Sequence, residues 1–266
     1  WDNIIAKWMN IPCVSDPSNP FNPLRVHPSL SVEHLPEPYF GDPADCSIVM
    51  INLNPGEGGP IQHWSMQNNS GIVGSAKTNK YSGLVIRFPF PSYSGAFYGT
   101  ATDKWWAGRR KYLEKLLGMK SVTSSKNPFA VELCALHSKG TVGINFGKYL
   151  TALKSVDPNL DPTNVIDIAI KNSDAKFGFA IGKPIYEALK SIGYTDIQIP
   201  NHHNVQNAKG KQNARQFAVV ERNGAKVLCT WTSGGNSCPS AAFDSYISSN
   251  IQCHSCDEFN NRHILT

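Results

Sequence analysis

The sequence predicts an α/β protein, a three-layer α/β/α sandwich around a central, mainly parallel four-stranded sheet. Three observations lead to this class. Four short runs are apolar on both faces, as strands buried between two layers are. Helical patterns separate these runs, and a strand–helix alternation is typical of a parallel sheet. Each run ends abruptly in a polar loop that contains Gly, Pro, Ser or His.

The predicted elements follow in chain order. The four strands are expected at 47–53, 129–136, 176–181 and 226–231. Helical segments are expected at 104–117, 146–155, 185–191 and 239–248, with a further element beginning at 165–170. The last strand is also expected to pair with 217–221 in a hairpin, because Asn223-Gly224 is a typical two-residue hairpin turn.

Proline content divides the chain. Eight of its 18 prolines fall in residues 1–45, which excludes long helices and central strands there. We therefore expect an extended arm (1–45) that packs on one α/β domain (46–250), followed by a tail (251–266). No internal repeat or linker divides the domain.

Composition restricts the class of protein. The 266 residues are 41% hydrophobic and 17% charged, as in folded globular proteins. No apolar run approaches the roughly 18 residues that a membrane span needs. The start shows no signal peptide, although the missing initiator Met leaves a trimmed leader open. We expect a cytoplasmic monomer.

Cysteine usage points away from disulfides and metals. The seven cysteines are odd in number and scattered, which favours a reducing compartment. Cys253 and Cys256 form one close pair, and a zinc site normally needs a second. We expect no metal and no cofactor.

The net charge of +5 is compatible with a phosphate-bearing partner. Basic residues gather in two places, around Trp105 and Trp106 and in a polar stretch with Lys209, Lys211 and Arg215. Such clusters occur in nucleic-acid contacts and also on ordinary solvated faces. Both interpretations stay open at this point.

The four strand-end loops are the best candidates for a site. They are Asn54-Pro55-Gly56, His137-Ser138-Lys139, Gly182-Lys183-Pro184 and the segment from Thr232 to Gly235. If the strands are parallel neighbours, these loops meet at one edge of the sheet, where open α/β proteins bind ligands. The chain carries no P-loop, dinucleotide fingerprint or G-x-S-x-G elbow.

Several motifs resemble the uracil-DNA glycosylase superfamily, closest to its mismatch-directed uracil and thymine glycosylases. The sequence VMINLNPG (49–56) resembles the first motif of that branch, whose strand ends in Asn-Pro-Gly. TDKWW (102–106), FAIGKP (179–184) and KVLCTWTSGG (226–235) resemble later pieces in the same order. The similarity covers about residues 40 to 245.

The resemblance implies hydrolysis of the N-glycosidic bond of uracil, or of a mismatched or damaged base, flipped out of DNA. A flipped base needs a pocket that stacks on it and bonds its edge. The departing anionic base also needs a positioned water and nearby dipoles. By this resemblance Asn54 would be catalytic and hold the water. The implied base, phosphate or groove contacts are Pro55, Gly56, Glu57, Trp64, His137, Ser138, Ser233, Gly234 and Gly235. The implied DNA-backbone contacts are Lys183, Lys209, Lys211 and Arg215.

This chain also departs from the family pattern. Asn52 stands where the family often has Gly, Thr232 replaces the usual Pro, and no bulky wedge residue follows Gly235. Two alternatives therefore remain. One is a non-catalytic nucleic-acid or nucleotide-binding module of the same fold, and the other is a hydrolase that acts on another N-glycoside, such as a free nucleoside.

Overall fold

The computed structural model describes residues 27–31, 39–40, 43–54, 56, 109, 128–140, 144–173, 176–206 and 212–232. Within 198–217 only the backbone is described. The strands are β1 (Tyr39–Phe40), β2 (Val49–Asn52), β3 (Phe129–Glu132), β4 (Phe177–Ile181), β5 (Thr195–Gln206), β6 (Gln212–Arg222) and β7 (Ala225–Thr232). The helices are α5 (Phe146–Val156), the 3-10 turn η3 (Pro158–Leu160), α6 (Pro162–Asn172) and α7 (Lys183–Ser191).

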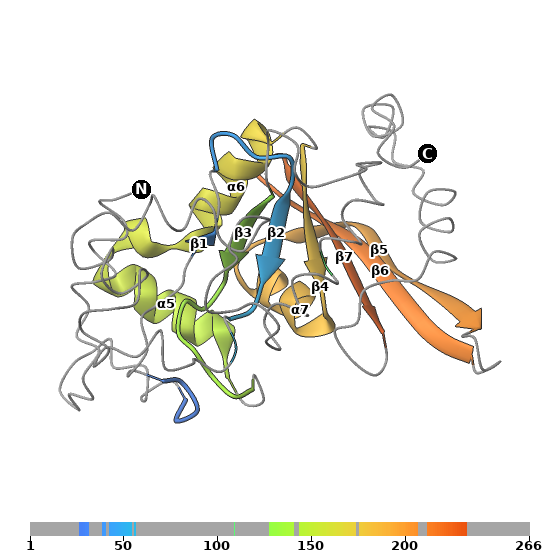
Figure 1. The fold of residues 1–266 in the computed structure, drawn as a ribbon, viewed down its shortest axis with the longest axis horizontal. Coiled ribbons are helices and arrows are strands. Elements are labelled where there is room, and N and C mark those ends of the chain that lie inside the picture. Colours follow the sequence, from blue (N-terminus) through green and yellow to red (C-terminus); the bar gives the residue numbers. More distant parts are fainter. Residues whose placement is uncertain are drawn as a thin grey trace, which may run out of the picture.

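The strands form one sheet in the order β1-β3-β2-β4-β7-β6-β5 (Figure 1). Its centre, β3-β2-β4-β7, is parallel throughout. These are the four strands expected from the sequence, so the α/β class and the parallel centre are confirmed. The sheet is larger than predicted, because β1 pairs antiparallel with β3 and the β6–β5 pair extends β7 antiparallel.

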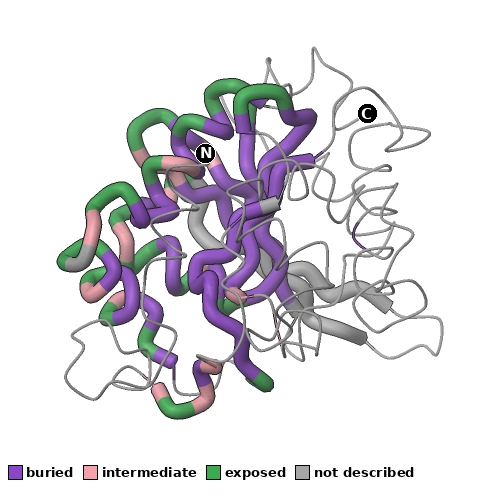
Figure 2. Tube along the Cα trace, turned by 60° about the vertical axis from the view of Figure 1, so that its left-hand side comes forward, coloured by how far each residue is buried: buried purple, intermediate pink, exposed green. Residues whose placement is uncertain are grey.

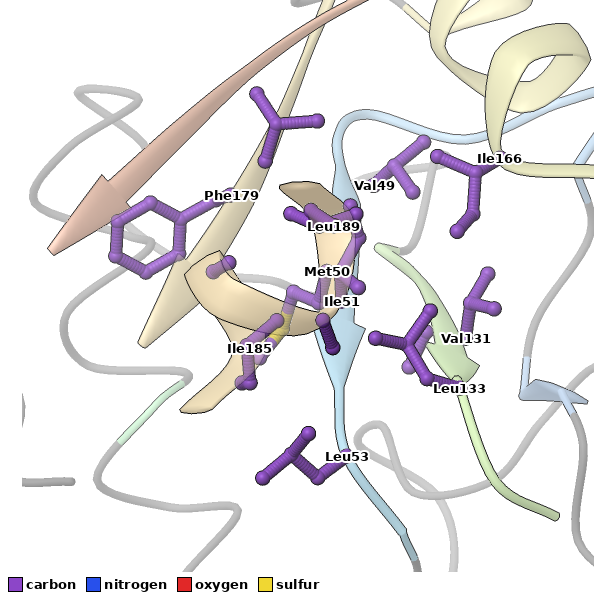
Figure 3. Close-up of a cluster of buried hydrophobic side chains, with 14 of the residues drawn as sticks. Val49, Met50, Ile51, Leu53, Val131, Leu133, Ile166, Phe179, Ile185 and Leu189 are labelled. Atoms are coloured by element: carbon purple, nitrogen blue, oxygen red, sulfur yellow. The ribbon is translucent and has the colours of Figure 1, made fainter. Parts of the chain in front are cut away.

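The parallel strands are central because they are apolar apart from Asn52 and Glu132, which bond to each other. Every residue of β2, β3 and β4 is buried, as Figure 2 shows for the middle of the molecule. Figure 3 shows Val49 and Ile51 of β2 surrounded by aliphatic side chains from α6, α7 and β3. Burial of one such side chain contributes roughly 1.5–3 kcal/mol.

The described helices lie on one face of the sheet. Gly178 and Val227 are register partners, and Ile170 of α6 fits against Gly178. Trp231 lies four residues after Val227 in β7, so its side chain points to the same face of the sheet. Its ring stacks on Tyr186 of α7 at a centroid distance of 4.9 Å. Helix α5 then packs beside α7 on this side of the sheet.

The second helical layer of the predicted sandwich falls on residues that the structure does not describe. The helices expected at 104–117 and 239–248 are represented there by Arg109 alone, which is helical and 7% exposed. Arg109 is therefore not a freely exposed cation of the Trp105–Trp106 group. Among the described helices, none combines the length and apolar character needed to cross a membrane.

Local sequence signals explain the element ends. Asp161 caps α6 by accepting from the Thr163 N–H at 3.0 Å, and Pro162 occupies the first turn, where its missing N–H has no consequence. Asn223 and Gly224 have φ angles of 52° and 79°, so the predicted Asn-Gly hairpin turn between β6 and β7 is confirmed.

Candidate functional site

The topology places the candidate site between the carboxyl ends of β2 and β4. From β2 the chain goes next to β3, whereas from β4 it goes through α7 to β5, on the opposite side of β4. Neighbouring parallel strands whose connections leave in opposite directions define a switch point, and ligands of open α/β sheets bind in the crevice there. Asn54 and Gly56 follow β2 at this point, and Gly182 follows β4.

Backbone hydrogen bonds hold these strand ends together. The Cys134 N–H donates to the Leu53 carbonyl at 2.7 Å, and the Ser138 N–H donates to the Gly56 carbonyl at 2.8 Å. On the other side, the Gly182 N–H donates to the Thr230 carbonyl at 2.8 Å. The loops after β2 and β3 are thus tied to one another, as are the ends of β4 and β7.

The side chains of Asn54 and Ser138 meet in this tied region. Their amide and hydroxyl atoms lie 3.0 Å apart. If Asn54 Nδ2 donates to Ser138 Oγ, the Ser138 hydroxyl donates in turn to the Gly140 carbonyl at 2.6 Å. Asn54 is half-buried. The structure therefore brings Asn54, Gly56 and Ser138 together, as the sequence predicted.

The orientation of the Asn54 amide is set by its surroundings. With Oδ1 directed inward, this oxygen accepts from the N–H of Gly56 at 3.2 Å, from the N–H of Ser138 at 3.3 Å and from the Ser138 hydroxyl at 3.0 Å. The single hydroxyl hydrogen of Ser138 then points to Oδ1 and not to the Gly140 carbonyl. The opposite orientation would direct an NH₂ group at those same donors. We therefore assign Oδ1 to the inside, since amide orientations are decided by the hydrogen-bond network. Nδ2, with two donor hydrogens, faces the other way.

His137 is more enclosed than a base-contacting side chain needs to be. It is 1% exposed, and its carbonyl accepts from the Ser31 N–H at 2.7 Å. Leu30 also forms an antiparallel bridge with Ser138. Residues 27–31 of the N-terminal segment thus pack directly on the loop after β3.

A buried polar pair below the site was not predicted. Asn52 Nδ2 donates to Glu132 Oε1 at 2.9 Å, one strand pair before the Asn54 loop. Glu132 is 3% exposed and Asn52 is 6% exposed. The available signal was a carboxylate within an otherwise apolar run, since buried charges need partners. From the sequence, Asn52 is marked only by its departure from the family pattern, which often has Gly at this position.

Lys183 begins α7, immediately after Gly182, whose φ of 129° is readily adopted only by glycine. Its ammonium group lies 3.5 Å from Glu187 Oε1, and both side chains are about 60% exposed. Exposed i,i+4 pairs of this kind contribute only about 0.3–0.5 kcal/mol. Lys183 is therefore an exposed charge near the site.

Several predicted site residues lie outside the described residues. They are Pro55, Glu57, Trp64, Lys209, Lys211, Ser233, Gly234 and Gly235. Arg215 is described by its backbone alone, in β6. Among the residues with described side chains, no three His, Cys, Asp or Glu groups gather as metal ligands would.

Comparison with protein-family models, with curated proteins and with solved structures found no match for this chain. The resemblance to uracil-DNA glycosylases thus rests on the short motifs, and the site rests on the geometry described above.

Proposed function

We propose that this protein hydrolyses the N-glycosidic bond of uracil, or of a mismatched or damaged base, flipped out of DNA. The observation that carries the proposal is the position of Asn54. It follows the first parallel strand at the switch point of the sheet, and is fixed there by Gly56 and Ser138. The motif resemblance assigns catalysis to the same residue.

The surroundings of Asn54 suit this chemistry. Gly56 has a φ of 83°, and a Cβ atom built on it meets nothing within 4 Å among the described residues. A planar base could therefore approach this backbone closely. The Asn54 amide and the neighbouring peptide dipoles are fixed in advance, and such fixed donors stabilise an anionic leaving group without reorganisation.

One observation favours the second candidate, a non-catalytic nucleic-acid or nucleotide-binding module. In the assigned orientation, Asn54 Oδ1 is occupied by two backbone donors and by the Ser138 hydroxyl, and Nδ2 lies on the other side of the amide. An outward NH₂ group donates well to a base carbonyl. It accepts no proton from a water, so it can position a water but cannot activate it as a base.

The test is cleavage of a labelled oligonucleotide that contains one uracil, presented single-stranded, opposite G and opposite A. Alkali then cuts the abasic sites formed by wild type, Asn54→Ala and the matched control Asn172→Ala. Asn172 is exposed at the end of α6, before β4, and so lies at the opposite edge of the sheet from Asn54. We expect scission by wild type and by the control, and at least about a tenfold loss in Asn54→Ala, a typical range for one oriented catalytic group.

Equal scission by Asn54→Ala and wild type would remove Asn54 from catalysis. Binding of the oligonucleotide without scission on any of the three substrates would favour the binding module. Release of base from free deoxyuridine, but not from DNA, would instead favour a nucleoside hydrolase.

A further inference from the structure

Residues 27–31 form a compact turn, called here the N-terminal turn, on the loop after β3. The Leu30 N–H donates to the His27 carbonyl at 3.2 Å, and the Ser29 N–H donates to His27 Nδ1 at 3.1 Å. Leu30 is 2% exposed and belongs to the hydrophobic core. Because interior side chains are closely packed, burial of Leu30 fixes where the backbone of this turn lies.

One peptide group, which joins His137 to Ser138, connects the N-terminal turn with the Asn54 loop. Its carbonyl accepts from the Ser31 N–H at 2.7 Å. Its N–H donates to the Gly56 carbonyl at 2.8 Å and lies 3.3 Å from Asn54 Oδ1 in the assigned orientation. The C=O and N–H of a planar trans peptide point in opposite directions. This peptide is therefore held by the turn on one side and bonded to the Asn54 loop on the other.

Rotation of the His137–Ser138 peptide would break the contacts on both sides. A flipped peptide would direct its carbonyl oxygen at Asn54 Oδ1 and at the Gly56 carbonyl, which are both acceptors. The bond from Ser31 opposes this flip, because His137 is buried and a buried carbonyl that loses its donor is costly. A hydrogen bond to the carbonyl also polarises the same peptide and strengthens the bond that its N–H donates.

We propose that Leu30 and Ser31 are positioning residues for Asn54, which hold the His137–Ser138 peptide in the orientation in which its N–H fixes Asn54 Oδ1. Leu30 places the N-terminal turn, and the Ser31 N–H supplies the hydrogen bond. An effect on base release rests on the proposed function, whereas the fixed orientation of the Asn54 amide does not depend on it.

A purely stabilising role of the N-terminal turn would have different consequences. Loss of a buried leucine anywhere in the core lowers global stability, so that amides which exchange by global unfolding all exchange faster to a similar extent. Loss of the hydrogen bond from Ser31 should instead expose the Ser138 N–H selectively. The Phe129 N–H is a suitable reference, since it donates to the Ile48 carbonyl at 2.9 Å at the beginning of β3.

The experiment is amide hydrogen exchange by NMR on the DNA-free protein, measured as the exchange rate of Ser138 relative to that of Phe129. The variants are Leu30→Ala and Ser31→Pro, in which proline removes the donating N–H. Ser31→Ala keeps this N–H and is the matched control for Ser31→Pro. Leu189→Ala is the matched control for Leu30→Ala, because Leu189 is buried in the same core near the end of α7, which leads to the start of β5 at the opposite edge of the sheet.

We expect the exchange ratio to rise about three- to tenfold in Leu30→Ala and Ser31→Pro, as for the loss of one net hydrogen bond, and by less than about twofold in both controls. Leu30→Met keeps an apolar side chain of similar volume and should restore most of the wild-type ratio. The side-chain NH₂ signals of Asn54, assigned by their absence from Asn54→Ala, should shift or broaden in Leu30→Ala and Ser31→Pro but not in the controls.

In an active enzyme, Leu30→Ala and Ser31→Pro should slow single-turnover base release about three- to tenfold, while KM changes by less than about twofold. This loss should disappear when Asn54 is already alanine, because a residue that acts through Asn54 then has nothing to position. A full loss in the Asn54→Ala background would overturn the proposal.

The NMR measurements can also overturn it. An unchanged exchange ratio in both Leu30→Ala and Ser31→Pro would do so, as would an equal rise in Leu189→Ala or unchanged Asn54 signals. If one of the two variants does not fold, the other decides. Because exchange is measured without DNA, a protein that releases no base can still support the positioning of Asn54, and only the proposed function then fails.

Discussion

The side chains of Asn54 and Ser138 lie 3.0 Å apart although 84 positions separate them in the chain. This contact joins the loops that follow two neighbouring parallel strands. It leaves Asn54 with little freedom, because Oδ1 also accepts from the backbone N–H groups of Gly56 and Ser138. A polar group fixed before a ligand arrives loses little entropy on binding, which is the arrangement that efficient sites need.

The first prediction concerns Asn54→Asp. One carboxylate oxygen can retain the N–H groups of Gly56 and Ser138, while the other replaces the outward NH₂ group with a proton acceptor. If hydrolysis needs a water held at this position, Asn54→Asp should release base at least about tenfold faster than Asn54→Ala at neutral pH. The measurement is single-turnover cleavage of uracil-containing DNA.

The pH profile of Asn54→Asp provides the control. Backbone N–H donors lower the pKa of a carboxyl group, so the new group should be ionised throughout the neutral range and the gain should persist there. A variant as slow as Asn54→Ala at every pH would show that no acceptor is needed at this position, and would favour the binding module.

The second prediction concerns the buried pair of Asn52 and Glu132. Asn52→Leu removes the 2.9 Å hydrogen bond to a carboxylate that stays buried, so it should lower the free energy of unfolding by about 2 kcal/mol. Replacing both residues with leucine removes the buried polar groups together, and the double variant should be more stable than the sum of the two single changes predicts. Urea denaturation of wild type, the two single leucine variants and the double variant gives the coupling energy between the two residues. A coupling energy near zero would show that Asn52 and Glu132 contribute to stability independently of each other.

The central strands could be predicted because their signal is local. Residues 49–51, 129–131 and 177–181 are apolar on both faces, as is typical of a strand covered on both sides. The Asn-Gly turn was equally local. From parallel order alone the strand-end loops were expected at one edge, and the structure confirms that arrangement for the ends of β2, β3 and β4.

Strand β5 and the buried Asn52–Glu132 pair could not be predicted, because both depend on contacts between distant parts of the chain. Strand β5 contains Pro200 and consecutive polar residues, so its sequence is typical of a loop, and only pairing with β6 makes it a strand. The Asn52–Glu132 bond joins residues 80 positions apart, and nothing near either residue specifies the other. Tertiary pairing overrode local propensity in both places.

The third prediction concerns stability at alkaline pH. Burial raises the pKa of the Cys134 thiol to about 12 from an ordinary value of 9, and burial with the hydrogen bond to Asp167 raises the pKa of Tyr194 well above 10. The folded state therefore keeps protons that the unfolded state loses. This stability is fully present below about pH 9 and declines as pH rises toward the folded pKa values.

Cys134→Ala should show the effect directly. Between about pH 10 and 11 the wild-type free energy of unfolding should fall more steeply than that of the variant, by about one proton or about 1.4 kcal/mol per pH unit. The readout is the slope of the unfolding free energy against pH, which a simple loss of packing leaves unchanged. Parallel curves for the two proteins would show that Cys134 titrates normally when folded.

The last prediction concerns packing between α6 and the sheet. A Cβ atom at Gly178 would lie 2.9 Å from Ile170 Cδ1, 3.3 Å from Val227 Cγ2 and 3.4 Å from Ile51 Cδ1. Gly178→Ala should therefore destabilise the protein by about 1–3 kcal/mol, because the surrounding core has no room to relax. Ile170→Val removes the nearest methyl group, so Gly178→Ala/Ile170→Val should recover part of that loss in thermal denaturation.

Gly140→Ala is the matched control, since nothing described lies within 4 Å of its Cβ position, and it should melt within a few degrees of wild type. If the double variant is no more stable than Gly178→Ala alone, the limiting contact is with Val227 or Ile51, and α6 does not set the fit of this face.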